Sequence, residues 1–125
     1  MPKRLSRPVV AAADAAKIMG IRAGAKSDHK FIGVWPIVVD GRVFARSWTQ
    51  TRGGWYKTFL DDPLGVIQVG DREVRIRAVR VKSERLRGKI DDAYGEKYDT
   101  KGSQKYVRGL RSPRRRDTTT EFVPR

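Results

Sequence analysis

A β-hairpin between Phe31 and Ser47 is the feature that most limits how this chain of 125 residues can fold. Phe31–Val39 and Arg42–Ser47 are rich in β-branched and aromatic residues, and Asp40-Gly41 between them is typical of a type I′ turn. Pro36 interrupts the first run. Because proline has no N–H to donate to a neighbouring strand, we expect it at a bulge or on a sheet edge. The hairpin therefore predicts an antiparallel sheet with one bent strand.

Further segments have the pattern of strands. Val66–Val69 and Arg72–Val81 are joined by a Gly-Asp turn, and Thr118–Val123 is a short β-branched run near the end of the chain. Another strand starts at Ile21. Within Arg72–Val81 the apolar residues change parity at Val79, which predicts either a bulge or a crossing from one packed surface to another.

Three helices are indicated between these strands. Ser6 can cap a helix over the alanine-rich run Val9–Met19, which a glycine follows. Trp55–Leu60 places its aromatic and aliphatic residues on one helical face before an Asp-Pro pair ends the helix. Ser83 can cap a third helix, in which apolar residues recur at helical spacing over Leu86–Tyr94.

The order of these elements predicts a mainly β (α+β) fold, a small antiparallel barrel with short peripheral helices. The chain length and a hydrophobic content of 38% suit one domain over residues 1–125. Within it we expect an N-terminal helical segment at 1–20 and a basic loop at 101–117.

The composition excludes several classes of site. The absence of cysteine rules out disulfides and thiolate chemistry, and a single histidine, His29, rules out the usual multi-histidine metal sites, so no metal is expected. No arrangement typical of a hydrolase is present. No apolar run approaches the roughly 20 residues needed to span a bilayer, so we expect no membrane partner and a cytoplasmic protein.

The chain is strongly basic, with 28 Lys and Arg against 14 Asp and Glu, a net charge of +14. Seven of the cations lie in Lys101–Arg116, which contains no acid. Such a tract can contact nucleic acid, or it can be a solvated connection. No aromatic ladder for base stacking and no zinc-finger or RRM signature accompanies it.

Hydroxyls, cations, paired glycines and aromatics gather in Arg46–Lys57, between a strand and a helix start. Backbone N–H groups at a helix start are unpaired, and glycine lets a phosphate approach the backbone closely. One interpretation is an anion-binding corner for a phosphorylated cofactor or a nucleic-acid phosphate. The other is a polar loop from which Trp55 fills the core.

Four motifs resemble those of a known family. They are the hairpin Val39–Ser47 (VDGRVFARS), the helix start Arg52–Tyr56 (RGGWY), Asp91–Tyr98 (DDAYGEKY) and Thr118–Pro124 (TTTEFVP). Together, over roughly Ile18 to Arg125, they resemble the uncharacterised bacterial family catalogued as domain of unknown function 2255. That family is placed in the flavin-binding split-barrel superfamily. The resemblance implies a six-stranded antiparallel split β-barrel, usually a homodimer, that can hold FMN or a deazaflavin coenzyme.

The resemblance also implies cofactor-binding positions, because in deazaflavin-dependent reductases of this superfamily the matching loop contacts the cofactor's phosphate. Trp35, Trp48 or Tyr56 could flank the ring, and Tyr56 is a candidate proton donor; no catalytic residue is otherwise assigned. The proline that commonly precedes the tryptophan is replaced here by Gly54. The implied cofactor-binding residues are Ser47, Thr49, Arg52, Gly53, Gly54, Trp55 and Tyr56. If a flavin binds, we assign the phosphate charge to Arg46, Arg52 and Lys57.

Three functional hypotheses follow. The first is a flavin- or deazaflavin-dependent oxidoreductase, similar to nitroreductases and deazaflavin reductases. The second is a basic nucleic-acid-binding module that uses Lys101–Arg116. The third is a cofactor-free dimeric barrel without enzymatic activity.

Overall fold

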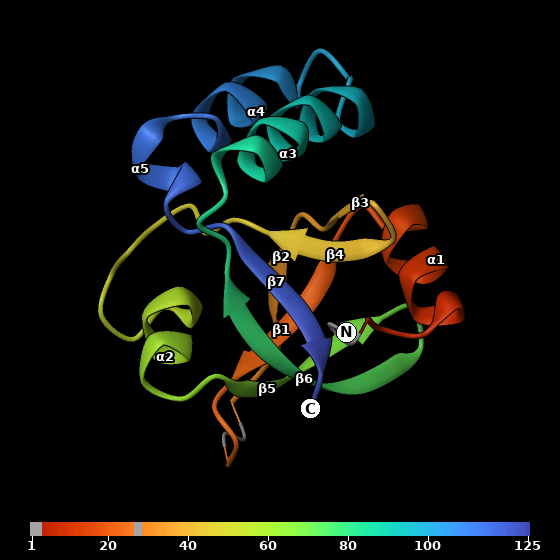
Figure 1. The fold of residues 1–125 in the computed structure, drawn as a ribbon, viewed down its shortest axis with the longest axis vertical. Coiled ribbons are helices and arrows are strands. Elements are labelled where there is room, and N and C mark those ends of the chain that lie inside the picture. Colours follow the sequence, from red (N-terminus) through yellow and green to blue (C-terminus); the bar gives the residue numbers. More distant parts are fainter. Residues whose placement is uncertain (1–3, 27–28) are drawn as a thin grey trace.

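One antiparallel sheet organises the computed structural model, which describes residues 4–26 and 29–125 (Figure 1). Within those residues the sheet has seven strands, and helices surround it. In chain order the elements are α1 (Arg7–Ala15), β1 (Met19–Ala23), β2 (Ile32–Val34), β3 (Ile37–Val39), β4 (Arg42–Ala45), α2 (Trp55–Asp61), β5 (Leu64–Val69), β6 (Arg72–Arg80), α3 (Glu84–Lys97), α4 (Gln104–Leu110), α5 (Pro113–Arg116) and β7 (Thr120–Pro124). The predicted mainly β fold class is confirmed.

The sheet curls because its two edge strands are consecutive in the chain. The strand order is β2-β1-β5-β6-β7-β4-β3, and only Trp35 and Pro36 separate β2 from β3. An extended chain from Val34 to Ile37 spans at most about 11 Å, so the two edges of the sheet lie close together. The predicted barrel has six strands, and the seventh arises because Pro36 divides the predicted strand Phe31–Val39 into β2 and β3.

The hairpin predicted around Asp40-Gly41 is confirmed. β3 pairs with β4 in antiparallel register, with Val39 opposite Arg42. Asp40 has φ 55° and Gly41 has φ 72°. Positive φ at both central residues is the conformation of a type I′ turn, whose twist matches that of the flanking strands.

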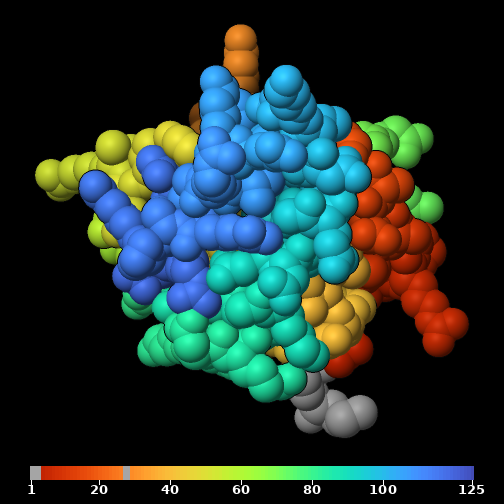
Figure 2. Space-filling view, turned by 90° about the horizontal axis from the view of Figure 1, so that it is seen from above, coloured from red at the N-terminus to blue at the C-terminus, as the bar shows by residue number. Residues whose placement is uncertain are grey.

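Two apolar clusters lie on opposite faces of the sheet. Inside the barrel, Val43 and Phe122 pack with side chains of α1 and α2. Outside it, Phe44 packs with Ile90 and Leu110 beneath α3 and α4. Figure 2 shows α3, α4 and α5, in green to blue, covering this side of the molecule. Neighbouring residues of β4 therefore serve different clusters, and the helical layer is fixed to the strand that leads into Arg46.

β6 contains no bulge, and it passes from one packed surface to the other, which is the second of the alternatives predicted from the sequence. It pairs with β7 residue by residue from Ile76 to Arg80. Val79 is 40% exposed, whereas Val81, just beyond the strand, is buried in the cluster outside the barrel. The apolar residues change parity because Val81 belongs to the second apolar cluster, outside the barrel, and the strand reaches that cluster without a bulge.

The first helix is shorter than predicted. α1 ends at Ala15, and Met19 starts β1, where it is fully buried and pairs with Val34. Burial in the sheet outweighs the helix preference of the alanine-rich run. Residues 1–3 of the predicted N-terminal segment lie outside the described residues.

The predicted basic loop at 101–117 contains two helices, α4 and α5. Val107 and Leu110 stand three positions apart, on one side of α4, and are buried with residues of α3. This apolar pair gives the segment a face to bury, which a solvated loop would lack. The prediction of a loop was therefore wrong, because it weighed the cations above the spacing of the apolar residues.

Candidate functional site

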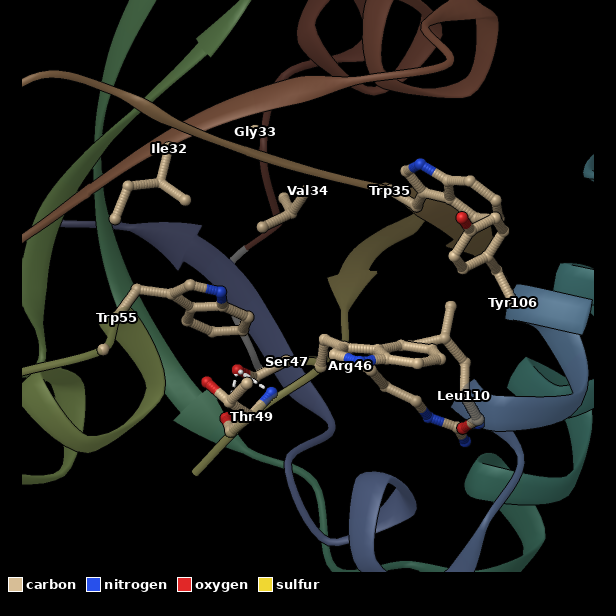
Figure 3. A pocket seen from close by; sticks show the side chains of 12 residues that line it. Ile32, Gly33, Val34, Trp35, Arg46, Ser47, Thr49, Trp55, Tyr106 and Leu110 are labelled. Carbon is tan, nitrogen blue, oxygen red and sulfur yellow. Dashed lines mark hydrogen bonds between the residues drawn. The ribbon is translucent and has the colours of Figure 1, made fainter. Parts of the chain in front are cut away.

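A cavity of about 580 Å³ lies where β2, the end of β4, the start of α2 and α4 meet. All three tryptophans of the chain, Trp35, Trp48 and Trp55, line it. Figure 3 shows Trp55 on one side of the cavity and Trp35 with Tyr106 on the other. A concave, mostly apolar cavity of this volume is typical of a small-molecule site.

Aromatic rings in contact with one another form one wall. Trp35 stacks on Tyr98, with ring centroids 4.3 Å apart and an interplanar angle of 11°. Tyr106 lies edge-on to both Trp35 and Trp48, with centroids 5.8 Å apart in each pair. Trp48 is 45% exposed and Tyr106 is 43% exposed, so both lie at the mouth. Such a wall suits a flat aromatic ligand, which can stack or pack edge-on against it.

Trp48 is held against α4 by Arg115 and Gly109. The guanidinium carbon of Arg115 lies 3.7 Å from the Trp48 ring centroid, and Arg115 Nε donates a hydrogen bond to the Trp48 carbonyl oxygen at 2.8 Å. A Cβ built at Gly109 would lie 2.4 Å from Trp48 Cη2. Only glycine allows this approach of an indole to the helix backbone.

The polar part of the cavity comes from the loop after β4. The Ser47 hydroxyl donates to the Thr49 carbonyl oxygen and accepts from the Thr49 N–H at 3.3 Å. Thr49 is exposed, and its hydroxyl lies 3.2 Å from that of Thr51. Gly54, the residue before α2, donates its N–H to the Thr51 carbonyl oxygen at 3.0 Å. These hydrogen bonds fix the loop and leave the Thr49 hydroxyl accessible to a ligand.

The Arg46 guanidinium is buried and paired away from the cavity, which corrects the phosphate-binding role predicted for it from the sequence. Its side chain is 0% exposed and forms an ion pair with Asp91, with Arg46 Nη1 2.6 Å from Oδ1. The guanidinium also donates to the Thr119 hydroxyl and to the carbonyl oxygens of Leu110 and Arg87 at 2.9 to 3.0 Å. Burial lowers the pKa of Arg46, and the hydrogen bond to Asp91 opposes that shift. The cation thus fastens β4 to the helical layer.

Four predicted cofactor-binding residues are not among those that line the cavity: Arg52, Gly53, Tyr56 and Lys57. Arg52 and Gly53 are exposed in the loop. Tyr56 is 4% exposed, and its hydroxyl donates to the Asp117 carbonyl oxygen at 3.1 Å. The expectation that Tyr56 flanks a ring or donates a proton there is therefore wrong, because it belongs to the core. The other five predicted residues line the cavity: Arg46, Ser47, Thr49, Gly54 and Trp55.

Part of the basic tract Lys101–Arg116 contacts the helical layer. Arg111 donates to the Asp91 carbonyl oxygen through Nε at 3.1 Å and Nη2 at 2.9 Å. Arg116 forms an ion pair with the Asp91 side chain at 3.1 Å and another with Glu84. With Arg115 on Trp48, at least three of the seven cations have structural contacts. Nucleic-acid binding by this tract stays a prediction.

Residues 4–26 and 29–125 contain neither a metal-binding cluster nor a membrane-spanning helix. No three histidine or acidic side chains of this part of the chain come together in a way that could hold a metal ion. Among the helices described there, none combines the length and the apolar character needed to cross a bilayer.

The sequence of nearly the whole chain identifies its family. The pattern described as "Uncharacterized protein conserved in bacteria (DUF2255)" matches residues 8–122. The chain belongs to the DUF2255 family. The resemblance carried by the four motifs is confirmed at this level. No curated protein matches the sequence.

Solved structures share the fold of this DUF2255 chain at low sequence identity. A conserved hypothetical protein, Rv2991 from Mycobacterium tuberculosis, has a TM-score of 0.62 and 12% identity over 96% of this chain and 79% of its own. An F420-H2 dependent reductase, FDR-A, has a TM-score of 0.59 and 18% identity over 86% and 93%. A structure described as a domain-swapped dimer has a TM-score of 0.55 and 17% identity over 85% and 77%. These likenesses confirm the predicted split-barrel fold.

Sequence reasoning missed several residues that line the cavity of this DUF2255 chain. Ile32 and Val34 alternate along β2, and Tyr106 and Leu110 stand four positions apart on α4. The second pair is a helical spacing that could have identified α4 as a wall, had the tract not been assigned to a loop. The first pair was visible only as part of a strand, because its position depends on how the sheet curls.

Lys97 of this DUF2255 chain yields a prediction on the pH dependence of stability. Its Nζ donates to the carbonyl oxygens of Ala13 and Pro36 at 3.0 and 2.9 Å. Burial lowers the pKa of Lys97 to about 8, Asp14 partly opposes the shift, and Lys17 adds to it. Above this pKa the folded protein has released a proton that the unfolded chain still binds. The contribution of Lys97 to the free energy of unfolding should therefore rise with pH between about 8 and 9.5.

Urea denaturation of the wild type and Lys97→Gln at about pH 7, 8 and 9.5 measures this contribution. The difference in the free energy of unfolding, wild type minus variant, should shift in favour of the wild type as pH rises. Lys89→Gln, at an exposed lysine of the same helix, serves as the control and should show no such trend. Parallel curves for the wild type and Lys97→Gln would contradict the prediction.

Proposed function

We propose that the cavity binds the planar ring of FMN or a deazaflavin coenzyme and that the protein uses this coenzyme in a redox reaction. The observation that carries the proposal is a cavity of about 580 Å³ lined by every tryptophan of the chain. The cavity lies at the corner between β4 and α2, where the family motif places its Gly-Gly-Trp-Tyr sequence.

The structural comparisons support this proposal through the fold. FDR-A is described as an F420-H2 dependent reductase, and F420 is a deazaflavin. At 18% identity that likeness extends to the barrel and not to individual residues. The choice of ligand therefore rests on the chemistry of the cavity.

The residues present fit the ring of such a coenzyme. Trp35, Trp48 and Trp55 offer apolar surfaces against which a tricyclic ring can pack. Arg46 faces the helical layer, so the phosphate would be held toward the loop, where Thr49 and Arg52 are exposed. When bound, the coenzyme would supply hydride transfer. The protein would orient the ring and exclude water from it.

The net charge of +14 favours a coenzyme with an acidic tail, which slightly favours a deazaflavin over FMN. If the tail contributes, coenzyme affinity should fall as salt rises, because screening weakens interactions between exposed charges. Affinity that does not change with salt would remove this part of the proposal.

Tryptophan fluorescence should report binding directly. Because all three tryptophans line the cavity, titration of protein purified through a high-salt wash with FMN or F420 should quench most of its emission in a saturable way. Arg52→Ala should weaken binding if this arginine holds the phosphate, whereas Lys26→Ala, in the exposed loop after β1, should not. Absence of a bound chromophore, together with no saturable quenching by either coenzyme, would contradict the proposed function.

We also propose that the protein forms a homodimer. A neighbouring structure is described as a domain-swapped dimer, and exposed apolar side chains of Ile32, Trp48 and Tyr106 surround the cavity mouth. Sedimentation equilibrium tests this; a monomer at all concentrations would refute it.

The alternatives make different predictions. Nucleic-acid binding through Lys101–Arg116 predicts affinity that falls steeply with salt and that weakens in Arg114→Gln. A cofactor-free barrel predicts neither coenzyme nor nucleic-acid binding. The same purified protein distinguishes all three.

A further inference from the structure

One face of α3 forms hydrogen bonds with residues that line the cavity, although its own side chains do not line it. Arg87, Asp91, Tyr94 and Tyr98 recur at i, i+4, i+7 and i+11, which places them along one side of the helix. The Arg87 carbonyl oxygen and the Asp91 carboxylate accept from the guanidinium of Arg46. The two tyrosines contact the backbone on which the tryptophan wall is built.

The Tyr94 hydroxyl connects two cavity walls. It donates to the Trp35 carbonyl oxygen at 2.8 Å and accepts from the Arg46 N–H at 3.2 Å. Trp35 and Arg46 both line the cavity, whereas Tyr94 does not. Tyr94 is 0% exposed. Its buried hydroxyl therefore links Trp35, between the two edge strands, to Arg46 at the end of β4.

Tyr98 supports the same break at two points. Its ring stacks on Trp35, and its hydroxyl lies 2.9 Å from the carbonyl oxygens of both Pro36 and Lys17, which share its single proton. Lys97 also donates to the Pro36 carbonyl oxygen. Between β2 and β3 the sheet ladder is interrupted, so the carbonyl groups of Trp35 and Pro36 depend on side chains for their hydrogen bonds.

We infer that Tyr94 and Tyr98 are positioning residues that set the place and tilt of the Trp35 wall relative to Arg46. This assigns a role to the family motif Asp91–Tyr98 within the cavity region, although none of its residues lines the cavity. Its consequence for coenzyme affinity rests on the proposed function, but the position of Trp35 can be measured without any ligand.

The test uses the full-length protein labelled with 5-fluorotryptophan, whose three ¹⁹F signals all come from the cavity. The signal of Trp35 is assigned by its loss in Trp35→Phe. Tyr94→Phe removes one hydroxyl, Tyr98→Phe removes the other but keeps the ring, and Tyr98→Leu removes the stack. Each should shift or broaden the Trp35 signal of the ligand-free protein, most strongly in Tyr98→Leu because a stacked ring shields the fluorine.

Ser83→Ala is the control for a general loss of helix stability. Ser83 caps α3 through a hydrogen bond from the Leu86 N–H at 3.2 Å and touches neither cavity wall. It should lower the melting temperature and leave the Trp35 signal in place. An unchanged Trp35 signal in Tyr94→Phe and Tyr98→Phe, or an equal shift in Ser83→Ala, would overturn the inference.

Titration of the same samples with FMN and F420 separates this inference from the proposed function. If the wild type binds, affinity should fall roughly threefold to tenfold in Tyr94→Phe and stay the same in Ser83→Ala. If the wild type binds neither coenzyme, the proposed function fails, and the ¹⁹F spectra of the free proteins still decide the positioning role.

Discussion

Replacing Asp91 by Asn should lower the free energy of unfolding by about 3 kcal/mol, because it leaves the buried Arg46 guanidinium without its counter-charge. Asp91 Oδ1 lies 2.6 Å from Arg46 Nη1, and its other oxygen lies 3.1 Å from Arg116 Nε. An amide keeps one acceptor oxygen but replaces the other with an NH2 donor, which would face one of the two guanidinium groups. For a domain of this size the melting temperature should fall by about 10 °C.

Asp92→Asn provides the matched control. Asp92 is the exposed neighbour of Asp91 on the same helix, and the substitution changes the net charge by the same amount. Its effect should stay within about 0.5 kcal/mol. Urea denaturation measures both variants, and equal losses would show that the net charge matters and the buried pair does not.

Patterns of residues close together in the sequence were sufficient to predict most of the barrel. The Asp40-Gly41 turn, the Gly-Asp turn between β5 and β6, and the Ser83 cap each involve residues close together in the chain, and each is confirmed. Pro36 was expected at a bulge or an edge, and it separates the two edge strands. The extra strand follows from that proline.

The remaining differences arise from contacts between distant residues. Met19 belongs to β1 and not to α1 because it pairs with Val34 of β2 and is buried in the apolar cluster inside the barrel. Helix α4 forms because Val107 and Leu110 have a second apolar cluster to join. Neither partner is visible from the local pattern. Burial in the folded protein outweighed the helix propensity of the alanine-rich run at Met19, and it outweighed the charge of the basic tract in α4.

The candidate site shows the same division. The loop after β4 was found from its hydroxyls, glycines and aromatics, and Ser47, Thr49 and Trp55 do line the cavity. Arg46 was assigned to the ligand because it is a cation at the right place in the sequence. Its actual acceptors lie on α3, α4 and the segment before β7, 41 to 73 residues away. Sequence spacing cannot show that a cation is already paired.

Gly109→Ala should displace Trp48 and weaken coenzyme binding about tenfold, which is about 1.4 kcal/mol. The new Cβ would lie 2.4 Å from Trp48 Cη2 and 2.7 Å from Cζ3. These atoms are the far end of a half-exposed side chain, so the indole can rotate away while α4 stays in place. The ring would then lose its packing on Arg115 and Tyr106, and with it the wall that they support.

Gly88→Ala separates this effect from the general consequence of adding alanine to a helix. No atom lies within 4 Å of a Cβ built at Gly88 in α3, so alanine there should stabilise the protein by about 0.5 to 1 kcal/mol and leave coenzyme affinity unchanged. In Gly109→Ala the helix gains the same preference, but the gain is offset by the lost contacts of Trp48. Acrylamide quenching of tryptophan fluorescence should rise in Gly109→Ala alone, since Trp48 becomes more exposed. If both variants bind FMN or F420 like the wild type while quenching rises in Gly109→Ala, then Trp48 moves without consequence and the ligand does not pack against this wall.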